Sequence, residues 1–181
     1  MEASAPQVPP PFEQIMLPHL DAAYNLARWL LRDPHDAEDA VQDACLRAFR
    51  AFDRFHGDDG RAWLLTIVRH VCYSQLRRNN REPVVQTFED EVHGSTHDPA
   101  EANALAWHEV KGELLRQALE RLPAEFREVI VLHDLEGLAY REIAAVAELP
   151  IGTVMSRLAR ARRKLQTELL ALTAKESSHG L

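Results

Sequence analysis

The chain has 181 residues and a formal net charge of −7, with 46% hydrophobic and 27% charged residues. This balance is typical of a folded globular protein, and no apolar run approaches the roughly 20 residues that a membrane span needs. The first stretch (MEASAPQVPPPFEQ) contains no basic residue and so does not resemble a secretory signal. We therefore expect a cytoplasmic protein that is not inserted in a membrane, with Cys45 and Cys72 as small core residues.

The N-terminal part of the chain predicts a disordered start followed by two helices. Residues 1–11 are Pro-rich, and the first helix is expected over 12–31. Asp33 is a suitable cap for a second helix, Pro34 suits its first position, and the helix should run to about Phe52. Its apolar spacing predicts one buried face. These buried residues are Ala37, Val41, Ala44, Cys45, Ala48 and Phe52. The opposite side presents Asp36, Asp39, Gln42 and Asp43.

A third helix is predicted over 61–79, after a loop at 56–60 that is rich in Gly and Asp. Its inner face is expected to carry Leu64, Ile67, Val68, Val71 and Cys72. Its outer face is expected to carry Thr66, Arg69, His70, Tyr73 and Arg77, with Trp63 near the edge.

The sequence after this helix lacks sustained periodicity until about Ala100, and we interpret residues 82–108 as an acidic, mobile linker. Helical spacing then continues to Leu122. Pro123 opens the next helix, and Gly137 is suited to end it. No strand-like alternation occurs, so the fold class is all-α: two small helical bundles joined by a flexible linker.

Residues 140–165 predict two short helices around a tight turn. The apolar residues of the second helix recur with helical spacing at Val154, Leu158, Ala161 and Leu165 and must pack inward. The outward side then carries Thr153, Ser156, Arg157, Arg160 and Lys164. A helix of this kind fits the major groove of duplex DNA, whereas the plain alternative is a solvated basic helix.

The distribution of charge favours nucleic acid in spite of the net negative charge. Residues 60–81 contain five arginines and no acid, and residues 149–167 contain five basic residues and no acid. Between them, residues 82–109 contain seven acids and no Lys or Arg. Two separate basic surfaces are suited to two contacts on one polyanion, although the overall acidity should make DNA binding by the chain alone poor.

The helix over 61–79 combines arginines with aromatic residues. Arg69, Arg77 and Arg78 are suited to phosphates, and Trp63, Tyr73 and Phe55 are suited to stacking on unpaired bases. Trp63 is equally compatible with a role in the core. The acidic face of the helix over 34–52 has no nucleophile or metal ligand beside it, so we expect no active site, metal or cofactor.

Four successive segments resemble the bacterial sigma-70 family, in its short extracytoplasmic-function (ECF) class. They are DPHDAEDAVQDACLRAF, GRAWLLTIVRHVCYSQLRR, LPAEFREVIVLHDLEGLAYREIA and LPIGTVMSRLARAR. The resemblance covers about residues 12–81 and 109–170. It implies a region 2-like domain over 12–81, a linker over 82–108, a region 4-like helix-turn-helix domain over 109–172, and a tail over 173–181.

The resemblance implies partners and roles for the two domains. The partners are core RNA polymerase, through its β′ coiled coil and its β subunit, promoter DNA, and an anti-sigma factor. Polymerase contact is expected at Asp36, Asp39, Gln42 and Asp43. Melted −10 DNA is expected at Phe55, Arg61, Trp63, Arg69, His70, Tyr73, Arg77 and Arg78. The −35 duplex is expected at Thr153, Ser156, Arg157, Arg160 and Lys164.

The chain departs from the family pattern at four positions. His70 stands where Asn is frequent, and Met155 where Lys or Arg is frequent. Glu148 stands at the turn where Gly is common, and Ala139 stands where Ser commonly caps a helix.

The function expected from these observations is that of a promoter-specificity sigma factor. It would direct polymerase to −35 and −10 elements and stabilise the melted −10 DNA. The alternative is an autonomous helix-turn-helix repressor or activator, which would bind its operator tightly without polymerase. A module that only sequesters other regulators would leave both basic surfaces unexplained, and an enzyme is the least supported class.

Overall fold

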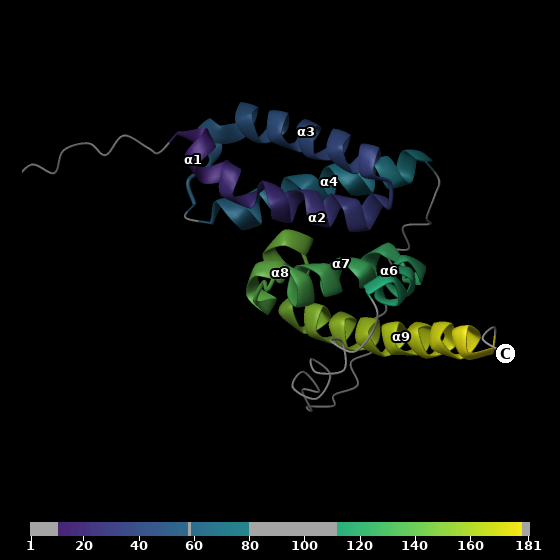
Figure 1. Cartoon of the computed structure of the whole chain (residues 1–181). Coiled ribbons are helices and arrows are strands. Elements are labelled where there is room, and N and C mark those ends of the chain that lie inside the picture. Colours follow the sequence, from purple (N-terminus) through teal and green to yellow (C-terminus); the bar gives the residue numbers. More distant parts are fainter. Residues whose placement is uncertain (1–10, 58, 80–111, 179–181) are drawn as a thin grey trace, which may run out of the picture.

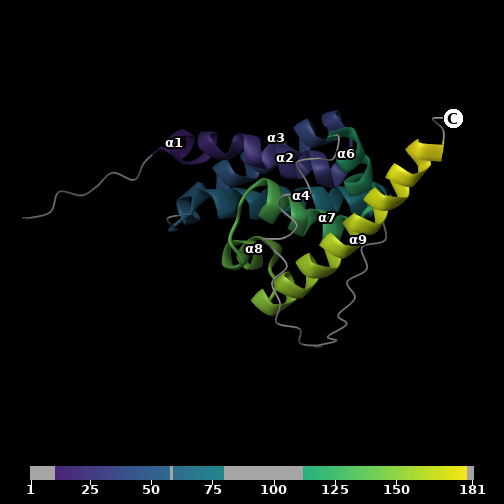
Figure 2. The same cartoon turned by 60° about the horizontal axis from the view of Figure 1, so that its bottom comes forward.

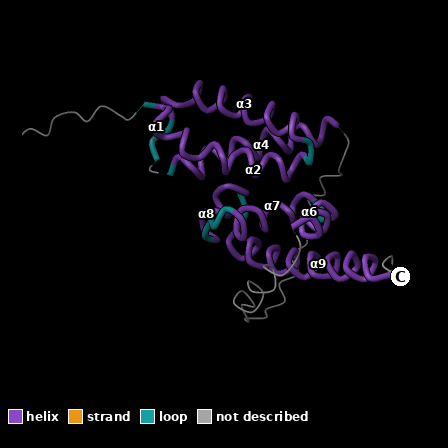
Figure 3. The backbone as a smooth tube through the Cα atoms, viewed as in Figure 1, coloured by secondary structure: helices purple, strands orange, loops and turns teal. Residues whose placement is uncertain are grey.

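The computed structural model describes residues 11–57, 59–79 and 112–178, and these ranges form helices joined by short loops without any strand (Figure 3). The expected all-α class is therefore confirmed. The predictions for the Pro-rich start, for residues 82–108 and for the pattern near Ala100 lie outside the described residues. Among the described helices, none combines the length and the apolar composition that crossing a bilayer requires.

The N-terminal helices form one layer of the molecule, in which α2, α3 and α4 pack on one another (Figure 1). The layer consists of α1 (Phe12–Met16), the 3-10 turn η1 (Leu17–His19), α2 (Leu20–Leu31), α3 (Pro34–Ala51), the 3-10 turn η2 (Phe52–Arg54) and α4 (Gly60–Asn79). The 3-10 turn at Pro18 interrupts the single helix that was expected over 12–31.

Two aspartates begin the long helices of this layer. The Asp33 carboxylate accepts hydrogen bonds from the backbone N–H of His35 and Asp36, at 2.9 and 3.0 Å, so the predicted cap of α3 is confirmed. Asp59 precedes α4, and its Oδ1 accepts from the N–H of Ala62 at 2.9 Å. Such caps each stabilise a helix by about 0.5–2 kcal/mol.

The core of this layer depends on small residues of α3. Its inner face is formed by four fully buried alanines, which let α2 and α4 approach closely: Ala37, Ala40, Ala44 and Ala48. Leucines of the neighbouring helices fill the remaining space, with Leu26, Leu30, Leu64 and Leu65 at most 1% exposed. Burying each such leucine contributes roughly 1.5–3 kcal/mol. Val41, Cys45 and Phe52, which were expected in the core, are only half-buried.

The C-terminal helices form the second layer. It consists of α6 (Gly112–Arg121), α7 (Ala124–Ile130), the π-helical turn η4 (Val131–Leu135), α8 (Tyr140–Ala147) and α9 (Ile151–Ser178). Gly137 has φ +70° and donates its N–H to the His133 carbonyl at 3.0 Å, so it ends the preceding helix as predicted. The π-helical turn was not expected, and α9 continues well beyond residue 165, where the predicted helix ends.

Helices α8 and α9 form the predicted helix-turn-helix. Val154, Leu158, Ala161 and Leu165 are all at most 2% exposed, which confirms the apolar stripe of α9. Glu148 occupies the turn in the left-handed region, with φ 56° and ψ 45°. Ala139 precedes α8 without a side-chain cap, although its N–H donates to Glu142 Oε2 at 2.6 Å.

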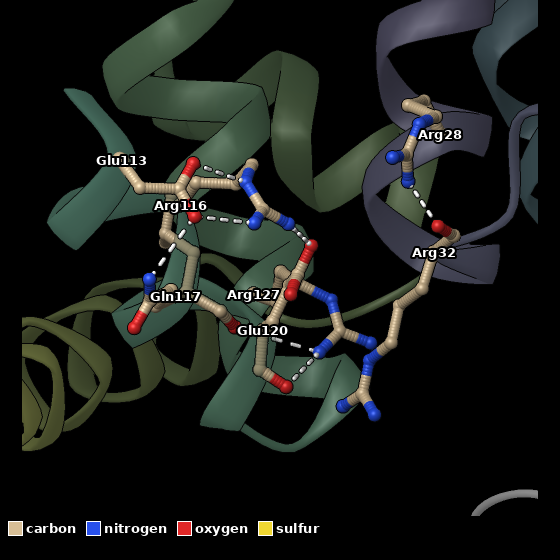
Figure 4. A network of polar contacts seen from close by, with 8 residues as sticks. Arg28, Arg32, Glu113, Arg116, Gln117, Glu120 and Arg127 are labelled. Carbon is tan, nitrogen blue, oxygen red and sulfur yellow. Dashed lines mark hydrogen bonds and ion pairs between the residues drawn. The ribbon is translucent and has the colours of Figure 1, made fainter.

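The two layers lie face to face, with α2 and α4 against α7 and α8, and α9 on the far side of the second layer (Figures 1 and 2). Arg127 of α7 is completely buried at this junction. Its guanidinium donates to the carbonyl of Leu122 at 2.7 Å, beyond the end of α6, and to that of Leu30 at 3.3 Å, in the last turn of α2. Figure 4 shows the same guanidinium reaching the carbonyl of Glu120, in the last turn of α6. A cation at two helix C-termini is favourable because the carbonyls there lack partners within the helix.

Candidate nucleic-acid interface

The outer side of α9 is the first basic surface. Ser156, Arg160 and Lys164 are exposed, and Thr153 and Arg157 are half-buried. The face is free of acidic side chains between Glu148 and Glu168. Arg162, by contrast, is 13% exposed and pairs with Asp134 at 2.5 Å, so its cation holds α9 to η4. The five predicted −35 residues thus share one side of the helix that an apolar stripe fixes in place.

An aromatic cluster lies where α4 begins. Trp63 has its ring centroid 4.8 Å from that of Phe55 and 6.5 Å from that of Phe52. All three rings are half-buried. Both interpretations of Trp63 have support, because it packs against other rings and also keeps part of its surface accessible to a base.

The middle of α4 meets α7 through one buried carboxylate. Glu128 has no exposed surface; its Oε1 lies 2.5 Å from Arg69 Nε, and its Oε2 accepts from the Tyr73 hydroxyl at 3.0 Å. The Arg69 guanidinium also lies 4.7 Å from the centre of the Tyr73 ring. Tyr73, expected on the outer face of α4, is only 8% exposed because α7 covers it. Burial, reinforced by the Glu128 carboxylate, raises the pKa of Tyr73 well above its ordinary value.

Two further glutamates of the second layer reach α4. Arg61 Nη2 donates to the Glu136 carbonyl at 2.6 Å and lies 3.1 Å from its Oε2. Asn25 of α2 donates to the other carboxylate oxygen, Oε1, at 3.0 Å. His70 Nε2 lies 3.2 Å from Glu148 Oε1, in a contact that is exposed on both sides. Sequence reasoning missed the contacts that all three glutamates make with the first layer, since nothing in local periodicity indicates which residues will meet across 50 or more positions.

The far end of α4 remains open to solvent. Arg77 and Arg78 are exposed and line a shallow pocket of 430 Å³ with Arg47, Val71 and Ser74. Arg77 donates to the Ser74 hydroxyl at 3.1 Å. The lining contains no acidic residue, so this end of the helix is suited to an anion such as a phosphate.

The polar face of α3 combines acidic and apolar groups. Asp39 and Gln42 are exposed, Asp36 and Asp43 are half-buried, and Asp43 accepts two hydrogen bonds from Arg47, at 2.8 and 3.1 Å. The same helix exposes two large apolar side chains that the sequence analysis did not single out, Leu46 at 56% and Phe49 at 61%. The sequence could have indicated them, because large apolar residues on an otherwise polar helical face are typical of a protein-binding surface.

The described residues hold no cluster of three or more His, Cys, Asp or Glu placed for a metal ion. The two thiols are free; Cys72 is buried and Cys45 half-buried. Burial, with the nearby Glu128 carboxylate, raises the pKa of Cys72 to about 12.

Comparison with known proteins identifies both halves of the chain. Residues 15–82 match the family described as Sigma-70 region 2, and residues 112–165 match Sigma-70, region 4. The ECF RNA polymerase sigma factor SigE of Mycolicibacterium smegmatis is 35% identical over 170 residues, which are 93% of this chain and 64% of that protein. The chain thus spans less than two thirds of the length of that relative. The ECF RNA polymerase sigma-E factor of Escherichia coli K12 is 32% identical over 144 residues, covering 76% of this chain and 75% of that protein.

Two solved structures share the fold and the sequence pattern. One is the sigma factor RpoE of Bartonella quintana in complex with the anti-sigma factor NepR, with a TM-score of 0.67 and 34% identity over 87% of this chain and 96% of that one. The other is CnrH in complex with the cytosolic domain of CnrY, with a TM-score of 0.60 and 29% identity over 88% of each chain.

Proposed function

The chain belongs to the ECF class of the sigma-70 family, and on that premise we propose that it binds core RNA polymerase and directs it to promoters with −35 and −10 elements. The observation that carries the proposal is the succession of both sigma regions in one chain, with a basic stretch free of acidic residues, 149–167, at the end of the second. The polymerase supplies the chemistry of transcription, and this chain supplies the choice of site.

The −35 element is read by α9. Ser156 and Arg160 project from the exposed side, where they are suited to base edges and phosphates in the major groove. The buried stripe on the opposite side fixes the rotation of the helix, so these side chains are presented together.

The −10 element is captured after melting by α4 and the loop before it. Arginine side chains pair with the phosphates, and half-buried rings such as Phe55 and Trp63 stack on the unpaired bases. Each stacked base contributes about 1–3 kcal/mol. Because stacking on a ring requires an unpaired base, this part of the binding energy favours the open promoter over the closed one.

Core polymerase docks on the polar face of α3, through Asp36, Asp39, Gln42 and Asp43. The exposed Leu46 and Phe49 extend this surface with apolar area that a partner would cover. An anti-sigma protein is the expected inhibitor, because the similar sigma factor RpoE was solved in complex with the anti-sigma factor NepR.

The test is transcription of sheared genomic DNA by purified core polymerase, with and without the chain, followed by sequencing of the transcript 5′ ends. We expect new start sites that depend on the chain and share two upstream elements. Start sites that are identical with and without the chain would refute the proposal. Tight, specific binding to an operator by the chain alone would favour the autonomous repressor or activator instead.

A further inference from the structure

The contact between the two layers falls on the surface that the proposed function assigns to melted DNA. Of the eight residues assigned to the −10 element, Arg61, Arg69, His70 and Tyr73 each contact a glutamate of the C-terminal layer. The glutamates are Glu128, Glu136 and Glu148, and they come from three different elements, α7, the end of η4 and the turn before α9.

The carboxylates in these contacts take the place that DNA phosphates would occupy. Each of the glutamates presents carboxylate oxygens to an arginine, a histidine ring nitrogen or a hydroxyl, as a phosphate would. At Glu128 the imitation is closest, because one carboxylate contacts both the arginine and the tyrosine from the interior of the interface. A DNA strand and this layer therefore compete for the same donors.

The backbone at Glu148 provides a second, independent observation. Its left-handed conformation, with φ 56°, suits glycine, and a residue with a Cβ costs about 1 kcal/mol or more there. The side chain that occupies this strained position is a carboxylate directed at His70, 3.2 Å away.

The other two functional surfaces stay accessible in this arrangement. α3 lies on the side of the first layer that faces away from the second, and Asp39 and Gln42 are exposed (Figure 1). Ser156, Arg160 and Lys164 of α9 are exposed as well. Of the three surfaces, the one for unpaired DNA is the one that the second layer meets, at Arg61, Arg69, His70 and Tyr73.

We propose that this packed state is autoinhibited: Glu128, Glu136 and Glu148 occupy the single-strand-binding face of α4, and the layers must separate before that face can hold melted DNA. The inference rests on the proposed function. It explains how the chain can bind polymerase and remain unable to capture single strands prematurely. Docking on polymerase through α3 precedes the opening, and separation of the two promoter-binding halves completes it.

The first test measures binding of a short, fluorescent, random-sequence single-stranded DNA pool to the full chain without polymerase. Glu128→Gln keeps a hydrogen-bond acceptor for Tyr73 but leaves Arg69 without its counter-charge. We expect it to bind the single strands at least tenfold more tightly, a change of about 1.4 kcal/mol. Binding of the corresponding duplex pool, carried by α9, should change less than twofold.

The matched control is Glu125→Gln, one turn earlier on α7. Glu125 is half-buried, and its substitution changes the net charge of the chain by the same amount as Glu128→Gln. An equal gain for Glu125→Gln and Glu128→Gln would show that charge alone strengthens binding and would overturn the proposal.

A second variant separates loosening of the packed state from the effect of net charge on DNA binding. Asn25 is exposed and is not assigned to DNA, and Asn25→Asp places a carboxylate against that of Glu136. The added negative charge should weaken DNA binding by ordinary repulsion, whereas loosening of the packed state should strengthen it. Tighter single-strand binding supports autoinhibition, and weaker binding contradicts it.

A cross-linked chain tests the packed state directly. The variant carries Asn25→Cys and Glu136→Cys in a Cys45→Ser background. A cleavable bis-maleimide joins the two new thiols, while the buried Cys72 thiol stays unreactive. We expect the linked chain to retain polymerase but to lose single-strand binding and promoter opening, and cleavage of the linker to restore both. Equal single-strand binding before and after cleavage would refute the inference, while chain-dependent start sites for the wild type would leave the proposed function intact.

Discussion

The shared cap formed by Arg127 makes a quantitative prediction about stability. The side chain is fully buried, and its Nη1 donates to the carbonyl of Leu122 at 2.7 Å and to those of Glu120 and Leu119 at 3.4 and 3.5 Å. Its Nη2 donates to the Leu30 carbonyl at 3.3 Å. Arg127→Met preserves most of the aliphatic stem and removes every one of these donors.

The expected cost follows from these distances. A hydrogen bond to a charged group contributes about 1.5–3 kcal/mol, and the three longer contacts together contribute about 1–2 kcal/mol more. The free energy of unfolding should therefore fall by about 2.5–5 kcal/mol. For a chain of this size that corresponds to a melting temperature lower by about 5–20 °C. Arg127→Lys, which keeps the charge but cannot reach both helix ends, should lose about half as much.

Urea unfolding followed by circular dichroism measures the change. The matched control is Arg121→Met, which removes an exposed arginine that pairs with Glu168 at 3.5 Å. An exposed pair of this kind contributes about 0–1 kcal/mol. If Arg127→Met were no more destabilising than this control, the reasoning about the shared cap would be wrong.

Three further predictions concern the DNA surface, the polymerase surface and pH. Arg157→Ala with Arg160→Ala should abolish −35-dependent initiation in run-off transcription while core binding persists; lost core binding would place the polymerase surface on α9. Asp39→Arg with Asp43→Arg should lower polymerase affinity in a pull-down and leave duplex binding unchanged, and undiminished affinity would count against α3. Burial and the Glu128 carboxylate raise the pKa of Cys72 from 9.0 to about 12, so the unfolded thiol ionises first and stability falls as pH rises above about 9, by about 1.4 kcal/mol per unit. Cys72→Ala should flatten this decline in urea titrations between pH 8 and about 11, and a parallel decline would exclude the thiol as its cause.

The features that could be predicted from sequence are those that depend on neighbouring residues. The start of α3 at Asp33, the end of the α7–η4 segment at Gly137 and the buried stripe of α9 follow from capping and periodicity, which act over a few positions. The same local logic identified both basic surfaces, because charge clustering is visible along the chain.

The contact between the layers could not be predicted, because it joins residues far apart in sequence. Tyr73 and Glu128 are 55 positions apart, and neither residue carries a local sign of the other. The spacing of α4 placed Tyr73 outside its own bundle correctly, but a second bundle covers it. The π-helical turn at Val131–Leu135 was missed for a related reason, since apolar spacing does not distinguish it from an α-helix.

The contacts of Arg127 affect how the sequence of this protein can change in evolution. Three of the four carbonyls that it contacts belong to its own half of the molecule. When the halves separate, Arg127 therefore loses the hydrogen bond to Leu30 and keeps those to the end of α6. The contact between the halves also includes polar pairs outside both cores, such as Asn25 with Glu136. Evolution can therefore adjust how readily the halves come apart, one such pair at a time, without endangering the folding of either.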